Sequence, residues 1–278
     1  MLLIKLKDFV QSPRLLLILF ITLFTTTQAY SETIKIGGTG NALGTMKLMA
    51  KAYSDAHPGI NIIVLPSIGS SGAIKAVPNN AINIGLSSRP LKEKEKQKGI
   101  RAIEYARSPT VIAVSTKEKV TKISLKELTE IYSGEMLTWP DGTSIRPIIR
   151  QPGDDNSIQL MNLSPALKKA VEIADTRPNL PFAATDQEAV DKIYSIPGGI
   201  GVTSLALIIS ENRPLRALTL DGVEPTPETA SSGQYPMLKR FYLILPEIIP
   251  EHVQAFIAFI SSEDGKAILK ENGNSIVL

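Results

Sequence analysis

The run Thr33-Ile34-Lys35-Ile36-Gly37-Gly38 opens the part of the chain that decides the fold, because it is typical of a short strand ending in a glycine loop. Apolar residues at helical spacing follow over 44–56, and the β-branched run 60–65 is typical of a buried strand. A second short helix is predicted through 73–77 and a third strand over 81–86. Strands that alternate with helices through short connections predict a parallel α/β sheet.

The rest of the chain extends this pattern into two α/β lobes. Further strands are predicted at 111–115, 145–149, 200–202 and 238–245, and the capping pattern Ser124-x-x-Glu127 predicts a helix through Tyr132. A single closing helix is predicted over 250–270. We expect one lobe to comprise residues 32–110 and 235–278 and the other residues 111–234.

The composition excludes several classes of protein. The 278 residues are 43% hydrophobic and 21% charged, as in ordinary globular proteins, and the net charge of +3 gives no reason to expect a nucleic-acid partner. The single Trp139 argues against an aromatic platform for sugars or bases. Because cysteine is absent, disulfides, thiolate catalysis, cysteine-bound zinc and a lipid-anchored N-terminal cysteine are excluded.

The first 31 residues are predicted to be a cleaved signal peptide. A basic lead that ends at Arg14 precedes the apolar run 15–24, which is too short to span a bilayer. Small residues allow cleavage after Ala29 or after Ser31. We therefore expect a periplasmic protein that is exported and is not a lipoprotein, with an uncleaved N-terminal membrane anchor as the alternative.

Three loops rich in Gly, Ser, Thr and Asn lie between predicted strand ends and helix starts. They are Thr39-Gly40-Asn41-Ala42, Gly69-Ser70-Ser71-Gly72 and Asp154-Asp155-Asn156-Ser157, and Ser87-Ser88-Arg89 ends a fourth strand. Unpaired N–H groups at helix N-termini and small hydroxyl side chains are suited to holding an anion. Strand ends of this kind carry the ligand site in open α/β folds. The loops predict an oxyanion or small acidic ligand, although each could serve only as a helix cap.

These loops carry a resemblance to a known family. Over nearly all of residues 32–278 the chain resembles the periplasmic phosphate-binding family of ABC-transporter solute receptors. The segment Gly69-Ser70-Ser71-Gly72-Ala73-Ile74-Lys75 carries the most specific match. The run 37–42 matches the family's glycine-rich stretch with its Thr, and 85–91 occupies the place of the third binding strand end. The run 148–157 lies where the family has Arg followed by Asp-Gly-Ser-Gly-Thr, and Pro197-Gly198-Gly199-Ile200-Gly201 and Tyr235-Pro236 fit two further signatures.

The resemblance implies a two-lobe type II periplasmic binding protein with mixed, mostly parallel sheets and flanking helices. It implies a monomer without cofactor or metal that captures phosphate and delivers it to an inner-membrane ABC permease. The alternative is a periplasmic ligand-sensing protein of the same fold that feeds a signalling receptor, or a binder of another oxyanion or small acidic solute. The implied ligand-binding residues are Thr39, Gly40, Asn41, Ala42, Ser70, Ser71, Ser88, Arg89, Arg150, Asp155, Asn156 and Ser157.

Two positions depart from the family pattern. Where this chain has Ser88, many members of the family hold an Asp that accepts the proton of bound phosphate. We therefore expect the acceptor to be Asp154 or Asp155, with helix capping as the alternative role for both. Arg89 is expected to bind the anion through its guanidinium, or else to form an ion pair with the acidic residues at 93 and 95.

Enzyme chemistry has little support in the sequence. His57 lies in a His-Pro-Gly turn and His252 on the closing helix, so neither is expected near the loops. The run 69–72 lacks the Gly-x-Ser-x-Gly spacing of a nucleophile elbow. The second predicted strand does not end in the acidic residue that would bind the ribose in a dinucleotide site. We expect a binding protein rather than an enzyme.

Overall fold

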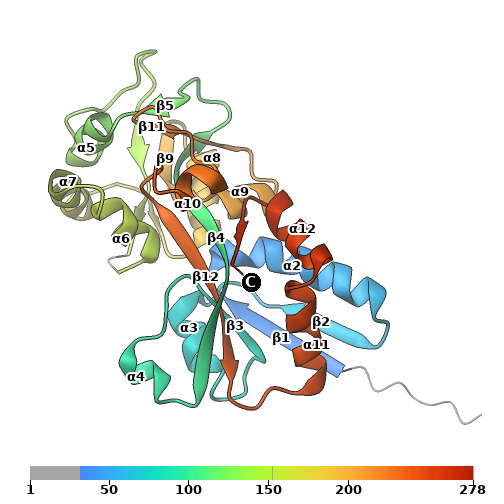
Figure 1. The fold of residues 1–278 in the computed structure, drawn as a ribbon. Coiled ribbons are helices and arrows are strands. Elements are labelled where there is room, and N and C mark those ends of the chain that lie inside the picture. The colour runs from blue at the N-terminus through green and yellow to red at the C-terminus, as the bar shows by residue number, and fades with distance from the viewer. Residues whose placement is uncertain (1–31, 152, 278) are drawn as a thin grey trace, which may run out of the picture. The chain divides into compact units, whose positions relative to one another are not determined.

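The computed structural model describes residues 32–151 and 153–277, and residues 32 onward form one compact unit. Most strands lie in a single nine-stranded sheet, with two short two-stranded sheets beside it (Figure 1). The predicted signal peptide lies outside the described residues. The strands are β1 (Glu32–Gly38), β2 (Ile60–Val64), β3 (Ile84–Ser87), β4 (Ile100–Ser115), β5 (Lys122–Ile123), β6 (Arg146–Pro147), β7 (Ile149–Arg150), β8 (Phe182–Ala183), β9 (Gly199–Ser204), β10 (Leu215–Ala217), β11 (Thr219–Leu220), β12 (Leu238–Pro246) and β13 (Ser275–Ile276).

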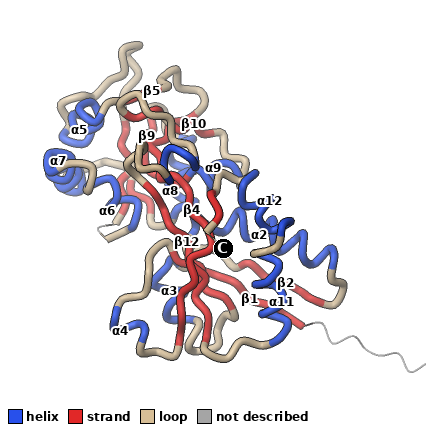
Figure 2. The backbone as a smooth tube through the Cα atoms, in the orientation of Figure 1, coloured by secondary structure: helices blue, strands red, loops and turns tan. Residues whose placement is uncertain are grey.

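Helices flank the strands on both sides (Figure 2). None of those described is long and apolar enough to cross a membrane. The helices are α2 (Gly40–Ala56), α3 (Gly69–Ala76), α4 (Glu93–Lys96), α5 (Leu125–Ser133), α6 (Asp155–Met161), α7 (Pro165–Thr176), α8 (Asp186–Ser195), α9 (Leu205–Ser210), α10 (Pro227–Ser231), α11 (Glu251–Ile260) and α12 (Glu263–Glu271).

The first part of the chain folds as predicted. Strand β1 pairs in parallel with both β2 and β3, and α2 and α3 connect the three strands. Buried apolar residues of α2 and α11 pack on one core with Ile34 and Ile84, whereas α3 packs on a second core with Ile244. The carboxyl ends of β1 and β3 therefore meet at one edge of the sheet, where the predicted glycine and serine loops follow.

Two long antiparallel strands, β4 and β12, run through the middle of the molecule (Figure 1). The sequence predicted only residues 111–115, the last third of β4, although the strand begins at Ile100. Tyr105 of β4 belongs to the core that contains β1 and α2, while Ile112 belongs to the core that contains α5 and α7. The sheet is thus mixed and continuous between two cores, as in a two-lobe α/β fold, and the residue boundaries of the lobes stay a prediction.

The C-terminal helix differs from the prediction. Instead of one helix over 250–270, the chain forms α11 and α12. The break arises because the Ser262 hydroxyl accepts a hydrogen bond from the Gly265 N–H and so caps a new helix. Gly265 lies against the preceding turn, where an added Cβ would stand 2.3 Å from the Phe259 oxygen. Apolar periodicity continues through both helices, which is why the break was missed.

Candidate functional site

A cavity of about 400 Å³ lies where the loops after β1 and β3 meet the segments around β7 and the start of α8. Its lining combines hydroxyl, amide and charged side chains with exposed backbone. The lining residues are Thr39, Asn41, Ser67, Ile68, Gly69, Ser70, Ser71, Ser88, Arg89, Arg150, Gln151, Gly153, Asp154, Asp155, Ile158, Ala184, Thr185 and Asp186. We call this cavity the cleft.

The structure brings most of the predicted site residues to the cleft. Those that line it are Thr39, Asn41, Ser70, Ser71, Ser88, Arg89, Arg150 and Asp155. The predicted residues that do not line it are Gly40, Ala42, Asn156 and Ser157. These four residues are buried beneath the cleft lining, so their positions do not favour direct contact with a ligand. The ligand-binding role of the full set stays a prediction.

The β1–β3 side of the cleft offers mainly neutral donors. Helix α2 begins at Gly40, directly after Thr39, and has no acidic residue of its own in the first turn, although the Asn41 N–H donates to the Asp186 carboxylate from the opposite side at 3.1 Å. Ser70, in the first turn of α3, accepts from the Ser88 N–H at 3.0 Å, and the two hydroxyls are 3.2 Å apart. The close packing of these loops fixes the hydroxyl groups before any ligand arrives.

Arg89 lies on the same side of the cleft and forms an ion pair with Glu95. Its two terminal nitrogens each donate to one oxygen of Glu95 at 2.8 Å, and one also donates to the Ser71 hydroxyl at 3.3 Å. The hydrogen bond from Arg89 lowers the pKa of Glu95 to about 2. The ion-pair alternative from the sequence is therefore present in the structure, although Arg89 also lines the cleft.

The opposite side of the cleft is charged and buried. Arg150, only 7% exposed, is the last residue of the short strand β7 and donates to Asp154 at 2.8 Å and to Asp186 at 3.0 Å. Asp154 also accepts from the Asn156 N–H and so caps α6, which begins at Asp155, inside the predicted loop 154–157. The capping alternative for Asp154 is thus present as well.

Asp155 pairs with a buried lysine that the sequence did not single out. Lys239, on β12, has no exposed side-chain area, and its ammonium group donates to the Asp155 carboxylate. An ammonium buried at this depth requires such a partner. Among the described residues, each of the three cations at or beside the cleft therefore already faces a carboxylate.

Asp186 is the cleft residue that the sequence analysis missed most clearly. It is 6% exposed and accepts hydrogen bonds from the Asn41 N–H at 3.1 Å and from the Asn156 side chain at 3.2 Å. Burial raises the pKa of Asp186, whereas Arg150 opposes that shift. One local feature of the sequence could have indicated Asp186. The Thr185 hydroxyl accepts a hydrogen bond from the Glu188 N–H and so caps α8, two residues after the end of the short strand β8.

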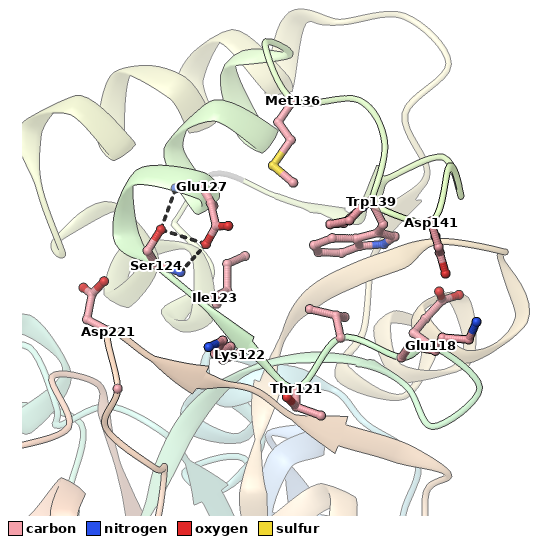
Figure 3. A pocket seen from close by; sticks show the side chains of 14 residues that line it. Glu118, Thr121, Lys122, Ile123, Ser124, Glu127, Met136, Trp139, Asp141 and Asp221 are labelled. Carbon is pink, nitrogen blue, oxygen red and sulfur yellow. Dashed lines mark hydrogen bonds between the residues drawn. The ribbon is translucent and has the colours of Figure 1, made fainter.

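A larger cavity of about 580 Å³ lies elsewhere, between α5 and the β5–β11 pair (Figure 3). Met136 and Trp139 contribute apolar surface to it. Several of its charged side chains are used in local structure, since Glu127 completes the capping box of Ser124 and Asp221 accepts from the Leu125 N–H.

The comparison with known proteins assigns the family. The family model described as "PBP superfamily domain" matches residues 25–264. The chain belongs to this superfamily. It is a family of solute-binding proteins, not of enzymes. The predicted two-lobe α/β fold and the predicted family are confirmed.

Individual relatives agree with this assignment. The chain is 25% identical to the phosphate-binding protein PstS of Borreliella burgdorferi over 255 residues, which cover 88% of this chain and 90% of that protein. Among solved structures, a phosphate ABC transporter substrate-binding protein from Clostridium perfringens with bound phosphate has a TM-score of 0.71 at 24% identity, covering 89% of this chain and all of that one. An ABC-type phosphate transport receptor from Vibrio cholerae has a TM-score of 0.59 at 21% identity, covering 87% and 99% of the two chains.

Proposed function

We propose that this chain captures phosphate in the cleft and delivers it to an ABC transporter in the membrane. The observation that carries the proposal is the convergence of the α2 and α3 N-termini, the hydroxyls of Thr39 and Ser70, and the buried Arg150 on one cavity. Helix N-termini, hydroxyl donors and a guanidinium together suit a tetrahedral oxyanion. Phosphate is the ligand named for the relatives that match over most of the chain.

The electrostatics of the cleft fit this role even though the two arginines that line it are both paired. Because Arg89 and Arg150 are already paired with carboxylates, the anion would be held mainly by dipoles and hydrogen bonds rather than by net positive charge. Such a site depends on the geometry of its donors. It would therefore favour an anion of one size and one protonation pattern over other anions of similar charge.

A thermal-shift screen tests the ligand class directly. The purified protein is heated with phosphate, sulfate, phosphonates and small carboxylic acids in turn, and a ligand that binds only the folded form raises the Tm by mass action. We expect phosphate to give the largest shift and Arg150→Met to abolish it. A larger shift with another anion would reassign the ligand, and no shift with any anion would contradict the oxyanion function.

Export and delivery are further parts of the proposal. We propose that a signal peptide that ends at Ala29 or at Ser31 is removed and that the protein acts as a periplasmic monomer. N-terminal sequencing of the exported protein should begin at Tyr30 or at Glu32. Uptake of labelled phosphate by vesicles that contain the permease should require this protein, whereas a signalling function predicts no effect on uptake.

A further inference from the structure

A second cavity of about 500 Å³ adjoins the cleft next to strand β12. The two cavities share Ser88, Arg89, Asp155 and Ile158 as lining residues. The rest of the wall of the second cavity comes from α6, from the start of β12 and from the segments beside them. We call it the side cavity. Because the two cavities meet, an anion held by the donors of the cleft can carry a substituent that continues into the side cavity.

Both cavities are larger than inorganic phosphate requires. Pockets of roughly 300–1,000 Å³ hold drug-sized organic ligands, and each of these two cavities lies in that range. Hinged closure of the lobes would narrow the side cavity least, because Leu238 and Arg240 lie on β12, which runs between the two cores. A rotation moves atoms in proportion to their distance from its axis. The side cavity is therefore positioned to stay open around a substituent when the lobes close.

The boundary between the two cavities presents acceptors of hydrogen bonds. Asp155 Oδ2 accepts from Lys239 and from the Gln159 amide, the latter at 2.9 Å, whereas Oδ1 has no partner among the described residues. The Asp155 side chain is 26% exposed, so a ligand can reach it. Gln159 Oε1 is buried and likewise accepts no hydrogen bond within the described part of the chain. A buried acceptor without a donor is unfavourable, and hydroxyl groups of a ligand would supply the missing donors.

The remaining lining favours a neutral substituent over an acidic one. Leu163 and Leu238 offer carbon surface to the side cavity. A carboxylate of the ligand at the boundary would lie beside the Asp155 carboxylate, and like charges at close range repel. Arg240 also lines the side cavity, but its side chain is 53% exposed and it lies 3.8 Å from Glu104. Water therefore screens its charge, and it does not compensate for that repulsion.

We propose that the cleft and the side cavity together bind phosphate monoesters of small polyols as well as inorganic phosphate. This inference rests on the proposed function. The phosphoryl group takes the place of phosphate at the donors of Thr39 and Ser70 in the cleft. The hydroxyls of the substituent donate to Asp155 and Gln159, and its carbon atoms pack against Leu238 in the side cavity.

Isothermal titration calorimetry with matched probes tests this ligand class. The wild type is titrated at about pH 8, where phosphoryl groups are dianions, with inorganic phosphate, glycerol 3-phosphate, propyl phosphate and 3-phosphoglycerate, each ester freed of inorganic phosphate. We expect glycerol 3-phosphate to bind within about tenfold of phosphate. Propyl phosphate lacks the hydroxyls and should bind at least about fivefold more weakly than glycerol 3-phosphate. The carboxylate of 3-phosphoglycerate should weaken its binding at least about tenfold.

Two variants of the side cavity sharpen the test. Gln159→Met keeps the length of the side chain and deletes the acceptor, so the ratio of glycerol 3-phosphate to phosphate affinity should fall at least about fivefold. Asn162→Trp adds bulk to the side cavity from the exposed end of α6 and should lower the same ratio. Gln254→Met is the matched control, because Gln254 lies on α11 outside both cavities, and it should leave the ratio unchanged. Thermal melts of all three variants check the fold.

Three results would overturn the inference while leaving the proposed function intact. One is glycerol 3-phosphate that binds the wild type more than about tenfold more weakly than phosphate. Another is propyl phosphate that binds as tightly as glycerol 3-phosphate. The third is an affinity ratio that neither Gln159→Met nor Asn162→Trp changes by more than about twofold. Failure of the wild type to bind inorganic phosphate would instead contradict the proposed function.

Discussion

The two sides of the cleft are built from different chemistry. The β1–β3 side presents Thr39, Ser70 and Ser88 on loops at strand ends, with neutral hydroxyls and backbone N–H groups. The opposite side presents Arg150 and Asp186, which are buried and paired across segments far apart in the sequence. The neutral side depends on local turns and helix starts, whereas the charged side depends on a network that is costly to interrupt.

This contrast predicts different responses to substitution. Removing one hydroxyl from the neutral side should cost one hydrogen bond and leave the fold nearly unchanged. Removing one ion from the charged side leaves another ion buried without its partner, which is strongly destabilising. Binding and stability should therefore fall together on the charged side and separately on the neutral side.

The largest effect is expected for Arg150→Met. The substitution leaves Asp154 and Asp186 facing each other without the guanidinium, so the free energy of unfolding should fall by about 3 kcal/mol or more and phosphate affinity by at least about a hundredfold. Urea denaturation and calorimetry measure the two quantities. Lys51→Met is the control, because Lys51 pairs with Asp55 on an exposed helix face and its loss should cost about 1 kcal/mol or less. Equal losses for the two variants would contradict the contrast.

The next largest effect is expected for Lys239→Met. The fully buried ammonium is lost and the Asp155 carboxylate keeps no ionic partner, so the free energy of unfolding should fall by about 2 kcal/mol. Adding Asp155→Asn should recover at least about half of that loss, because the uncompensated charge is then removed. A double variant that is less stable than Lys239→Met would show that the pair does not act as a unit.

A smaller effect is expected on the neutral side. Ser70→Ala removes the acceptor of the Ser88 N–H and should weaken phosphate binding by about fivefold, with a loss of about 1 kcal/mol or less in the free energy of unfolding. Thermal melts and calorimetry of the same preparation separate the two values. A loss of stability as large as that of Lys239→Met would show that Ser70 mainly stabilises the fold and does not mainly bind the ligand.

The smallest effect is expected from the Arg89–Glu95 pair, and it depends on pH. Because the pKa of Glu95 is lowered from 4.5 to about 2, the pair's contribution is complete above 4.5 and is lost as the pH falls toward 2. The stability difference between the wild type and Glu95→Gln should therefore shrink over that range. Glu93→Gln is the control, because the Glu93 side chain is 85% exposed. This variant should not change how the free energy of unfolding depends on pH between 4.5 and 2. A constant difference for Glu95→Gln would contradict the pairing.

The sequence predicted the neutral side well because its determinants are local. Periodicity and glycine placement in residues 33–87 were sufficient to order β1, α2, β2, α3 and β3, and the order of parallel strands then brought their loops together. The break between α11 and α12 was missed because the Ser262 cap interrupts a helix without interrupting its apolar pattern.

The charged side could not be derived in the same way. Asp186 reaches Asn41 across 145 positions, and Lys239 reaches Asp155 across 84. No spacing rule relates residues so far apart, and a lysine inside a strand predicts an exposed position rather than a buried one. Asp154 and Asp155 were recognised as carboxylates near the ligand, but their partners, which decide their roles, follow only from the tertiary structure.

The central claim is that this cleft holds phosphate, and one titration tests it most directly. Protein unfolded in denaturant, refolded without phosphate and titrated with phosphate in a calorimeter should bind one anion with a Kd of about 10 μM or tighter, and Arg150→Met should show no measurable binding. Absence of binding by the wild type at millimolar phosphate, or undiminished binding by Arg150→Met, would contradict the account.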